Sequence, residues 1–326
     1  MAFVAVLMCV NFASCSSSEE NVPEPSKEQK KYTVSLGFCG EVLDVNYAPM
    51  SRADESDLYG IQVYSTSDEN AGYTPYAFGL FDSVEGVTIG LLADKKYKFV
   101  VTLLKEGKNI LAYYGHYYRV PFDISDPYKV GTPLNSFTFS SDCYFTTLST
   151  GRTELNFGSY YYGHPTADRY YGELSDYVPT EDAEVNIEMK RVVFGVKYIV
   201  EGMDEGKLKV LMTDAPELEI ESPATSTDDI IYTFASASEA YYNSDNYQET
   251  IGISFVWIKG EEEIPQGDYE FTFKRKQITT ITLKVSDEII NNKGVGIETE
   301  AGGLTNGDNK TVENGQVVNT PVNPAP

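Results

Sequence analysis

The stretch AEVNIEMKRVVFGVKYIVEG, residues 183–202, carries the clearest structural signal in the sequence. Its apolar side chains alternate on one parity up to Met189 and on the other parity from Val192 to Val200. Alternation with a period of two is typical of a half-buried β-strand, and β-branched and aromatic residues fit its pleated surface. The pattern therefore predicts a long antiparallel strand, which we interpret as the first strand of a second β domain.

The change of parity falls at the neighbouring cations Lys190 and Arg191. Because the period is two, the face of the strand that points inward moves by one residue at this point. A β-bulge, which inserts one extra residue, would let both halves face the same core. Alternatively, the strand crosses from one sheet of a sandwich to the other.

Length and composition indicate an acidic globular protein with two domains. A chain of 326 residues is long for one domain, and 41% hydrophobic residues supply enough material for two cores. The 25 Tyr and 16 Phe favour β-structure. A formal net charge of −24 argues against nucleic acid as a partner, because a broad contact with a polyanion needs a basic face.

Apolar alternation elsewhere predicts further strands, with helices only as short connectors. The candidate strands in the first half are 32–38, 59–64, 87–92, 96–104, 109–120, 136–139 and 153–157. Those in the second half are 183–201, 207–213, 218–221, 230–234, 250–258, 269–274 and 279–285. The Tyr-rich segment 159–177 receives no assignment. Strands at this spacing, separated by Gly, Asp and Asn turns, predict an all-β fold with two antiparallel β-sandwich domains in tandem, at 32–180 and 183–300.

The first 31 residues do not belong to the predicted fold. The apolar run 2–10 is too short to span a bilayer as a helix and resembles the hydrophobic region of a secretory signal. The sequence FASC that ends at Cys15 resembles a bacterial lipobox, whose cysteine is lipidated and becomes the mature N-terminus. The alternative is an ordinary signal with an incidental cysteine. We therefore assign 1–15 to a lipoprotein signal peptide and 16–31, rich in Ser, Glu, Pro and Lys, to a flexible tether.

Two further cysteines, Cys39 and Cys143, lie in the first predicted domain. In an exported protein they could form a disulfide, and they could equally be buried free thiols. The sequence leaves both alternatives open, because pairing depends on the distance between the two Cα atoms.

The order of these features resembles the fimbrillin-like surface proteins of Bacteroidales. The resemblance rests on the lipobox, a first strand, a loop carrying Ser51-Arg52-Ala53, and the strand IEMKRVVFGVKYIV that follows the first domain. The segment YEFTFKRKQITTITLKV, 269–285, is similar to the last strands of that family. The resemblance covers about 15–287. It implies transthyretin-like sandwiches and a shaft, tip or anchor subunit of fimbriae, held at the cell surface by outer-membrane lipid through Cys15.

The resemblance also implies assembly by strand exchange, with other fimbrial subunits as partners. In the family, cleavage after a basic residue behind the first strand releases that strand, and a neighbour's strand fills the groove. Arg52 and Ala53 occupy the matching place, and 32–38 is the strand that would leave. The tail 301–326 is a flexible or donor-strand-like segment, although Pro321 and Pro324 cannot donate to a ladder. The alternative is that Arg52 is only a loop charge in an uncleaved anchor or a non-fimbrial relative.

Motifs that would carry catalysis or bind a metal or cofactor are missing. The sequence contains no P-loop, no dinucleotide-binding glycine pattern, no HExxH and no GxSxG. The two histidines, His116 and His164, come with no clustered third metal ligand. The acidic residues Asp54, Glu55 and Asp57 beside Arg52 could bind a cation, but they are more typical of a solvated acidic loop. We therefore predict no catalytic residue, no metal, no cofactor and no enzymatic activity.

Tyrosine clusters supply one functional alternative. Aromatic faces stack on the apolar faces of sugar rings, so a group of them could bind glycans of a host or bacterial surface. The candidate platform consists of Tyr161, Tyr162, Tyr170, Tyr171 and Trp257. The structural alternative is that these rings cover sheet ends or fill the contact between the domains.

Overall fold

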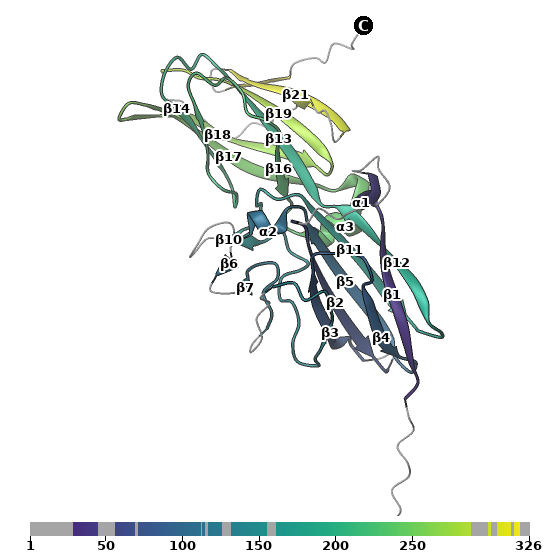
Figure 1. Ribbon diagram of the computed structural model, residues 1–326. Coiled ribbons are helices and arrows are strands. Elements are labelled where there is room, and N and C mark those ends of the chain that lie inside the picture. The colour runs from purple at the N-terminus through teal and green to yellow at the C-terminus, as the bar shows by residue number, and fades with distance from the viewer. Residues whose placement is uncertain are drawn as a thin grey trace, which may run out of the picture.

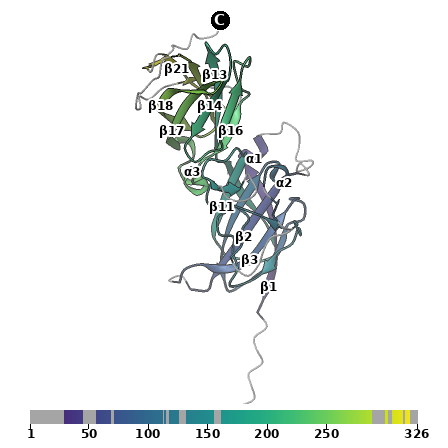
Figure 2. The same ribbon diagram turned by 90° about the vertical axis from the view of Figure 1, so that its left-hand side faces the viewer.

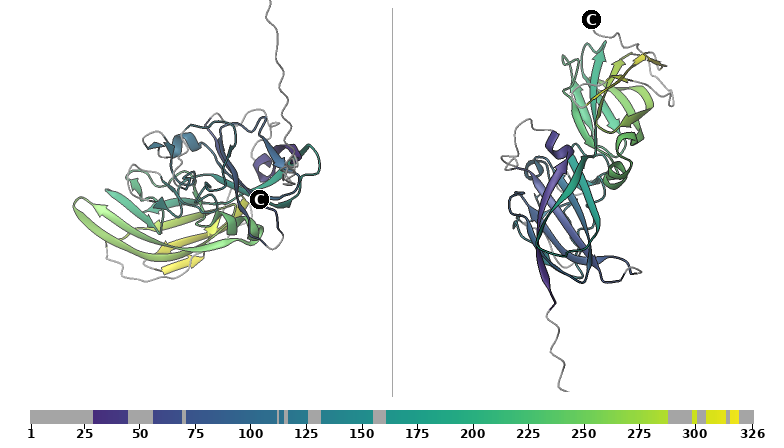
Figure 3. Two further views of the ribbon diagram at one scale, coloured as in Figure 1. Left: turned by 90° about the horizontal axis from the view of Figure 1, so that it is seen from below. Right: turned by 90° about the vertical axis from the view of Figure 1, so that its right-hand side faces the viewer.

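The computed structural model shows two β lobes arranged end to end (Figure 1). It describes residues 29–44, 56–68, 71–111, 113–114, 117–125, 132–154, 161–287, 299–300, 305–313 and 316–319. Figure 2 and the right-hand view of Figure 3 show the same arrangement from two other sides. The longest helix in these ranges, α3 (Ala237–Asn243), has seven residues, and none of the helices described is long and apolar enough to cross a membrane.

A curled eight-stranded sheet forms the first domain. Its spatial order is β4 (Thr88–Leu92), β1 (Lys31–Gly40), β12 (Ala183–Arg191), β11 (Arg169–Tyr177), β5 (Lys96–Leu104), β2 (Leu58–Thr66), β3 (Thr74–Phe81) and β8 (Thr138–Phe139). The curl brings the two ends of the sheet together, since the Tyr76 hydroxyl of β3 donates to the Gly90 carbonyl of β4 at 2.9 Å. The sheet thereby encloses one of its own faces.

The enclosed face holds the first hydrophobic core. Val34, Leu36 and Phe38 of β1 pack there with Ile187 and Met189 of β12, and each of these side chains is at most 5% exposed. Every second residue of β1 therefore faces inward, as its sequence alternation predicts.

The outer face of the same sheet is covered by the described parts of the segment 107–167, including Leu111, Phe122, Phe145 and Leu148. Its short elements are α2 (Gly107–Ile110), β6 (Tyr113–Tyr114), β7 (Tyr117–Tyr118), β9 (Thr153–Glu154) and β10 (Tyr161–Tyr162). The fully buried Arg169 of β11 holds this segment against the sheet. Its guanidinium donates to the carbonyls of Leu148 and Thr150 and to the Thr102 hydroxyl of β5.

The second domain is a sandwich of two sheets. One has the order β16 (Ile230–Thr233), β13 (Val193–Glu201), β19 (Gln277–Lys284), β21 (Thr305–Glu313) and β20 (Thr299–Glu300), with β22 (Gln316–Asn319) paired to β21. The other has the order β15 (Leu218–Glu221), β14 (Lys207–Met212), β17 (Gln248–Lys259) and β18 (Glu262–Lys274). Buried aromatic residues fill this core, including Phe194, Tyr198, Phe255, Trp257 and Phe273. Helix α3 and the short helix η1 (Ser244–Asn246) lead from β16 to β17.

The stretch 183–202 turns out to connect the two domains. β12 pairs with β1 and β11 in the first sheet, whereas β13 pairs with β16 and β19 in the second domain. Ile187 and Met189 face the first core, and Phe194 and Tyr198 face the second. The change of parity therefore marks a crossover between domains, which neither of the two interpretations described. The predicted boundary at 180–183 is wrong, since β12 completes the first domain and the second begins at Val193.

Three other features of the fold differ from expectation. The sheets are mixed rather than purely antiparallel, because β1 pairs with β12, and both β13 and β21 pair with β19, in parallel. The predicted strand 109–120 is replaced by the end of α2 and the two-residue strands β6 and β7. β3 forms where no strand was expected, since Pro75 and Gly79 interrupt its alternation.

The cysteines of the first domain do not pair. Cys39 is half-buried in β1, and Cys143 is buried within the segment that covers the outer face of the sheet. Both are free thiols, which decides between the two alternatives that the sequence left open. This domain is therefore held by packing and hydrogen bonding without a disulfide.

Replacing Phe194 with Ala is expected to destabilise the second domain by about 3–5 kcal/mol, because its fully buried ring stacks on Phe273 with centroids 4.7 Å apart. Urea unfolding followed by the fluorescence of Trp257, the only tryptophan, measures this change. Leu211→Ala in the same domain is the control, since Leu211 is 38% exposed and should lose less than about 1 kcal/mol. Equal losses in the two variants would contradict the assignment of Phe194 to the core.

Candidate functional site

β1 occupies a slot inside the first sheet, between β4 and β12. Its residues Lys31 to Ser35 pair antiparallel with β4, and Val34 to Gly40 pair in parallel with β12. Its inward side chains lie in the enclosed core. Removal of β1 would therefore expose two unpaired strand edges and an apolar floor at once.

A carboxylate at the end of β1 reaches into the second domain. Glu41 is the first residue of α1 (Glu41–Asp44), which lies at the junction of the two lobes in Figure 1. Its Oε2 accepts from Arg275 Nη1 at 2.7 Å, and its Oε1 accepts from Arg275 Nη2 at 3.1 Å. Lys276 Nζ donates to Oε1 at 3.1 Å, and the Arg191 backbone amide donates to Oε2 at 2.8 Å. We call Glu41, Arg275, Lys276 and the Arg191 amide the junction cluster.

The junction cluster is largely removed from water. The Arg275 side chain is 1% exposed and that of Glu41 is 18% exposed. Arg275 also donates to the backbone carbonyls of Ser244 and Arg191, at 2.8 Å and 2.9 Å, and these two hydrogen bonds fix the position of its guanidinium. Burial alone would raise the pKa of the Glu41 carboxyl, but the hydrogen bonds from Arg275 and the Arg191 amide outweigh it and lower the pKa below its ordinary value.

The Arg191 side chain has its own acidic partner. Its Nε donates to Asp168 Oδ1 at 2.7 Å and its Nη2 donates to Asp168 Oδ2 at 2.9 Å. Asp168 therefore pairs with Arg191, whereas Glu41 pairs with both Arg275 and Lys276.

Three of the predicted site residues lie outside the described ranges. These are the lipid-attachment candidate Cys15 and the cleavage candidates Arg52 and Ala53. In the sequence, Arg52 follows Glu41 by 11 residues, so a cut after it would separate β1 and α1 from the rest of the chain.

The predicted tyrosine platform does not assemble. Tyr170 and Tyr171 are adjacent in β11 and point to opposite faces of the sheet, where both are buried. Trp257 is buried in the other domain, where its indole nitrogen donates to the Glu205 carbonyl at 2.9 Å. Of the remaining two residues, Tyr161 is 39% exposed and Tyr162 is half-buried. These five residues cannot form one sugar-binding surface.

The histidines give no metal centre among the described residues. His164 is buried, and its ring nitrogens contact the Thr213 carbonyl at 3.0 Å and Glu249 Oε2 at 2.8 Å. His116 lies outside the described ranges. Within those ranges, no three His, Cys, Asp or Glu side chains are grouped so that they could hold a metal ion.

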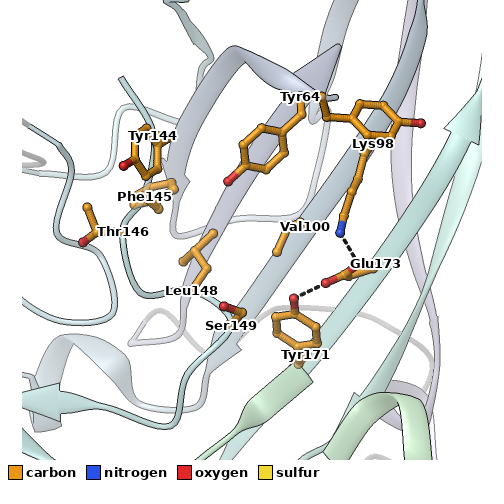
Figure 4. A pocket seen from close by; sticks show the side chains of 11 residues that line it. Tyr64, Lys98, Val100, Tyr144, Phe145, Thr146, Leu148, Ser149, Tyr171 and Glu173 are labelled. Atoms are coloured by element: carbon orange, nitrogen blue, oxygen red, sulfur yellow. Dashed lines mark hydrogen bonds and ion pairs between the residues drawn. The ribbon is translucent and has the colours of Figure 1, made fainter. Parts of the chain in front are cut away.

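A cleft of about 370 Å³ opens on the outer face of the first sheet (Figure 4). It is lined by Tyr64, Tyr73, Lys98, Val100, Tyr144, Phe145, Thr146, Leu148, Ser149, Tyr171 and Glu173. Figure 4 shows Tyr64 on the strand side and Tyr144 on the covering segment, with Leu148 below them and Glu173 next to Lys98 and Tyr171. Aromatic and apolar side chains thus surround a few polar ones, among them Lys98 and Glu173.

The polar group of the cleft is centred on Glu173, whose side chain is only 6% exposed. Lys98 Nζ lies 2.6 Å from Glu173 Oε2, and the hydroxyls of Tyr171 and Tyr242 donate to the same carboxylate. Burial, together with the nearby Tyr144 and Glu173, raises the pKa of Tyr64 to about 12, so its hydroxyl stays protonated at neutral pH.

Comparison with known proteins gives matches among solved structures only. No family model and no curated protein sequence matches the chain. The chain is similar in structure to fimbrial proteins and candidate adhesins of Bacteroidales. One is the tip fimbrial protein Mfa3 from Porphyromonas gingivalis, at 10% identity and a TM-score of 0.33, covering 79% of this chain and 97% of that one. A fimbrial assembly protein from Parabacteroides distasonis has 13% identity and a TM-score of 0.31, covering 78% and 90%. A candidate adhesin from Bacteroides ovatus has 9% identity and a TM-score of 0.41, covering 88% and 99%.

The Glu41→Gln variant is expected to lose about 2 kcal/mol of stability at pH 7, because a partly buried charge pair with Arg275 is broken. Since the folded-state pKa of Glu41 is lowered, its contribution is complete above the ordinary value near 4.5 and disappears as the pH falls through the lowered value. Chemical denaturation of both proteins from pH 7 to pH 3 measures the difference. Glu270→Gln, an exposed acid on β18, is the control. A difference that does not change with pH would contradict the ion pair.

Proposed function

We propose that this protein is a non-enzymatic cell-surface lipoprotein that serves as a structural or adhesive subunit of fimbriae and joins its neighbours by strand exchange. The observation that carries the proposal is the position of β1. It is the first strand described in the chain, and it fills a slot between two other strands and supplies three side chains to the enclosed core. A strand in that position can be replaced by one from another subunit without changing the rest of the sheet.

The proposed maturation step is a cut after Arg52. It would leave β1 and α1 attached to the sheet by non-covalent contacts only. Burial of a side chain the size of Val34, Leu36 or Phe38 is worth about 1.5–3 kcal/mol, so the vacant slot strongly favours an apolar alternating strand. Before the cut, β1 of the same chain fills the slot and forms its hydrogen bonds, which keeps the subunit from polymerising.

We place the uncut protein at the outer membrane, with Cys15 carrying the lipid and residues 16–31 acting as the tether. Both lie before β1 in the sequence. A cut after Arg52 would therefore separate the lipid from the folded domains, and the released body would be retained only by its neighbours in a fimbria. The absence of catalytic motifs from the sequence supports a role that depends on binding and assembly.

Limited digestion with trypsin tests the strand-exchange proposal. The expected result is early cleavage after Arg52, followed by SDS-resistant ladders, because a strand that bridges two subunits dissociates slowly. Arg52→Ala should abolish both the cleavage and the ladders. N-terminal sequencing and unheated gel electrophoresis measure the two events.

The matched control is Arg152→Ala, which removes an exposed arginine of the same domain and should leave the ladders unchanged. If the protein is cleaved after Arg52 and yet stays monomeric in size-exclusion chromatography, it is not a polymerising subunit.

The cleft in Figure 4 favours a second candidate function, the binding of surface glycans. Its tyrosine and leucine side chains can pack against the apolar face of a pyranose ring, and Lys98 and the Tyr64 hydroxyl can bond to sugar hydroxyls. Its volume of about 370 Å³ is within the range of small-molecule sites. An adhesive subunit would carry such a site on the body that remains after strand exchange.

Saturation-transfer NMR with a panel of neutral mono- and disaccharides tests the cleft. We expect Tyr64→Ala to weaken any sugar that binds by at least about tenfold, because the variant loses both the stacking face and a hydroxyl donor. Tyr161→Ala, outside the cleft, should leave that affinity unchanged. Loss of binding in Tyr161→Ala alone would place the sugar elsewhere, and no binding by any sugar would remove this function.

A further inference from the structure

We infer that His164 forms a pH-dependent contact between the two domains, which is complete when its imidazole ring is protonated and weakens when the ring loses a proton. His164 lies on the segment that covers the first sheet. Both partners of its ring, Thr213 and Glu249, lie in the second domain. The inference does not depend on the proposed strand exchange or on the cleft.

Both ring nitrogens of His164 face groups that accept hydrogen bonds. Nδ1 lies 3.0 Å from the backbone carbonyl oxygen of Thr213, and Nε2 lies 2.8 Å from Oε2 of Glu249. A neutral imidazole carries one N–H and can donate to only one of these oxygens, whereas an imidazolium carries two and donates to both. The geometry therefore favours the protonated ring.

The carboxylate of Glu249 is held in its charged form. The Tyr247 hydroxyl donates to Oε1, and His164 contacts Oε2. Burial alone would raise the pKa of the Glu249 carboxyl, but the hydrogen bonds from His164 and Tyr247 outweigh it and lower the pKa below its ordinary value. Because histidine side chains in general change charge between about pH 5 and pH 8, a rise in pH across this range removes one N–H from the contact.

The contact is shielded from water, so a missing N–H is not readily replaced. The side chain of His164 is 7% exposed and that of Glu249 is 19% exposed. The ring of Phe194 packs against the imidazole, with centroids 6.1 Å apart. A neutral imidazole would leave either the Thr213 carbonyl or the Glu249 carboxylate without this donor, and a buried acceptor in that state is costly.

The other charged groups that the second domain places near this contact are acidic. The Asp214 side chain lies beside the residue that precedes His164, since a Cβ added to Gly163 would be 3.2 Å from Asp214 Cβ. The charge of Glu239 in α3 acts on Tyr247, the second donor to Glu249. Negative charge around an imidazole favours its protonated form.

The charged residues that follow His164 on its own segment bind groups of the first domain. Asp168 pairs with the Arg191 side chain of β12. The guanidinium of Arg169 donates to the Leu148 carbonyl. We therefore assign the pH dependence of the contact to the pair of His164 and Glu249.

Backbone hydrogen bonds beside this pair join the same two parts of the chain. The His164 amide donates to the Asp214 carbonyl at 2.7 Å. The Thr233 amide donates to the Pro165 carbonyl at 2.9 Å. Exchange of these amide hydrogens with solvent requires local opening, so it reports how firmly the two domains are joined.

Hydrogen exchange of the full-length protein, followed by mass spectrometry, tests the inference. An unstructured reference peptide in the same solution corrects for the direct effect of pH on exchange chemistry. We expect the corrected exchange rate of the segments 161–167 and 230–235 to rise about tenfold between pH 5.5 and pH 8.5, because a hydrogen bond between charged groups is weakened. The corrected rate of β2, inside the first sheet, should change less.

His164→Gln should remove this pH dependence, because the glutamine side chain does not titrate. His116→Gln, which replaces the only other histidine, is the matched control and should keep it. If His164→Gln does not fold, as judged by Trp257 fluorescence, Glu249→Gln serves instead, since a neutral amide gives the protonated ring no counter-charge.

A corrected rate that stays constant in the unmodified protein would overturn the inference. The same tenfold rise in His164→Gln, or in its substitute Glu249→Gln, would do so as well. Loss of the rise in His116→Gln alone would assign the pH dependence to the other histidine and equally overturn it.

Discussion

The backbone ladder between β1 and β12 is the contact on which the rest of the structure depends. It joins the first strand of the first domain to its last, with Val34 opposite Ala183 and Gly40 opposite Met189. This pairing closes the enclosed core, because the inward residues of both strands meet there. Since β12 continues through Val192 into β13, the same ladder also fixes where the second domain begins.

Many strands could be predicted because alternate side chains along a strand are buried, which leaves a period of two in the sequence. The strand 218–221 was predicted with the bounds that β15 has, and the parity change near Arg191 did mark a real structural event. Its meaning could not be read from the sequence, because a change of parity records that the inward face moves and not which core receives it. Tyr170 and Tyr171 show the same limit of sequence patterns. Because they are adjacent in one strand, their side chains point to opposite faces of the sheet.

The candidate sites were beyond sequence reasoning for a different reason. Glu41 is one of 49 acidic residues, and its partner Arg275 lies 234 positions away. The cleft likewise draws Tyr64, Lys98, Tyr144 and Glu173 from four separate segments. Neither site has a local motif, because its chemistry arises only when distant elements pack together. The junction cluster also shows how one carboxylate at the end of a core strand can link two domains.

The parallel pairing of β1 with β12 has a further consequence for any assembly built through this slot. A strand that restores the hydrogen bonds of β1 must run in the same direction as β12, since the parallel and antiparallel ladders have different bonding patterns. Every joint would then have the same orientation, and each subunit would contribute two unlike surfaces to its neighbours. Contacts of that heterologous kind do not close on themselves as a twofold dimer does. They produce a ring where the rotation between successive subunits closes, and otherwise an open-ended fibre with a distinct front and back.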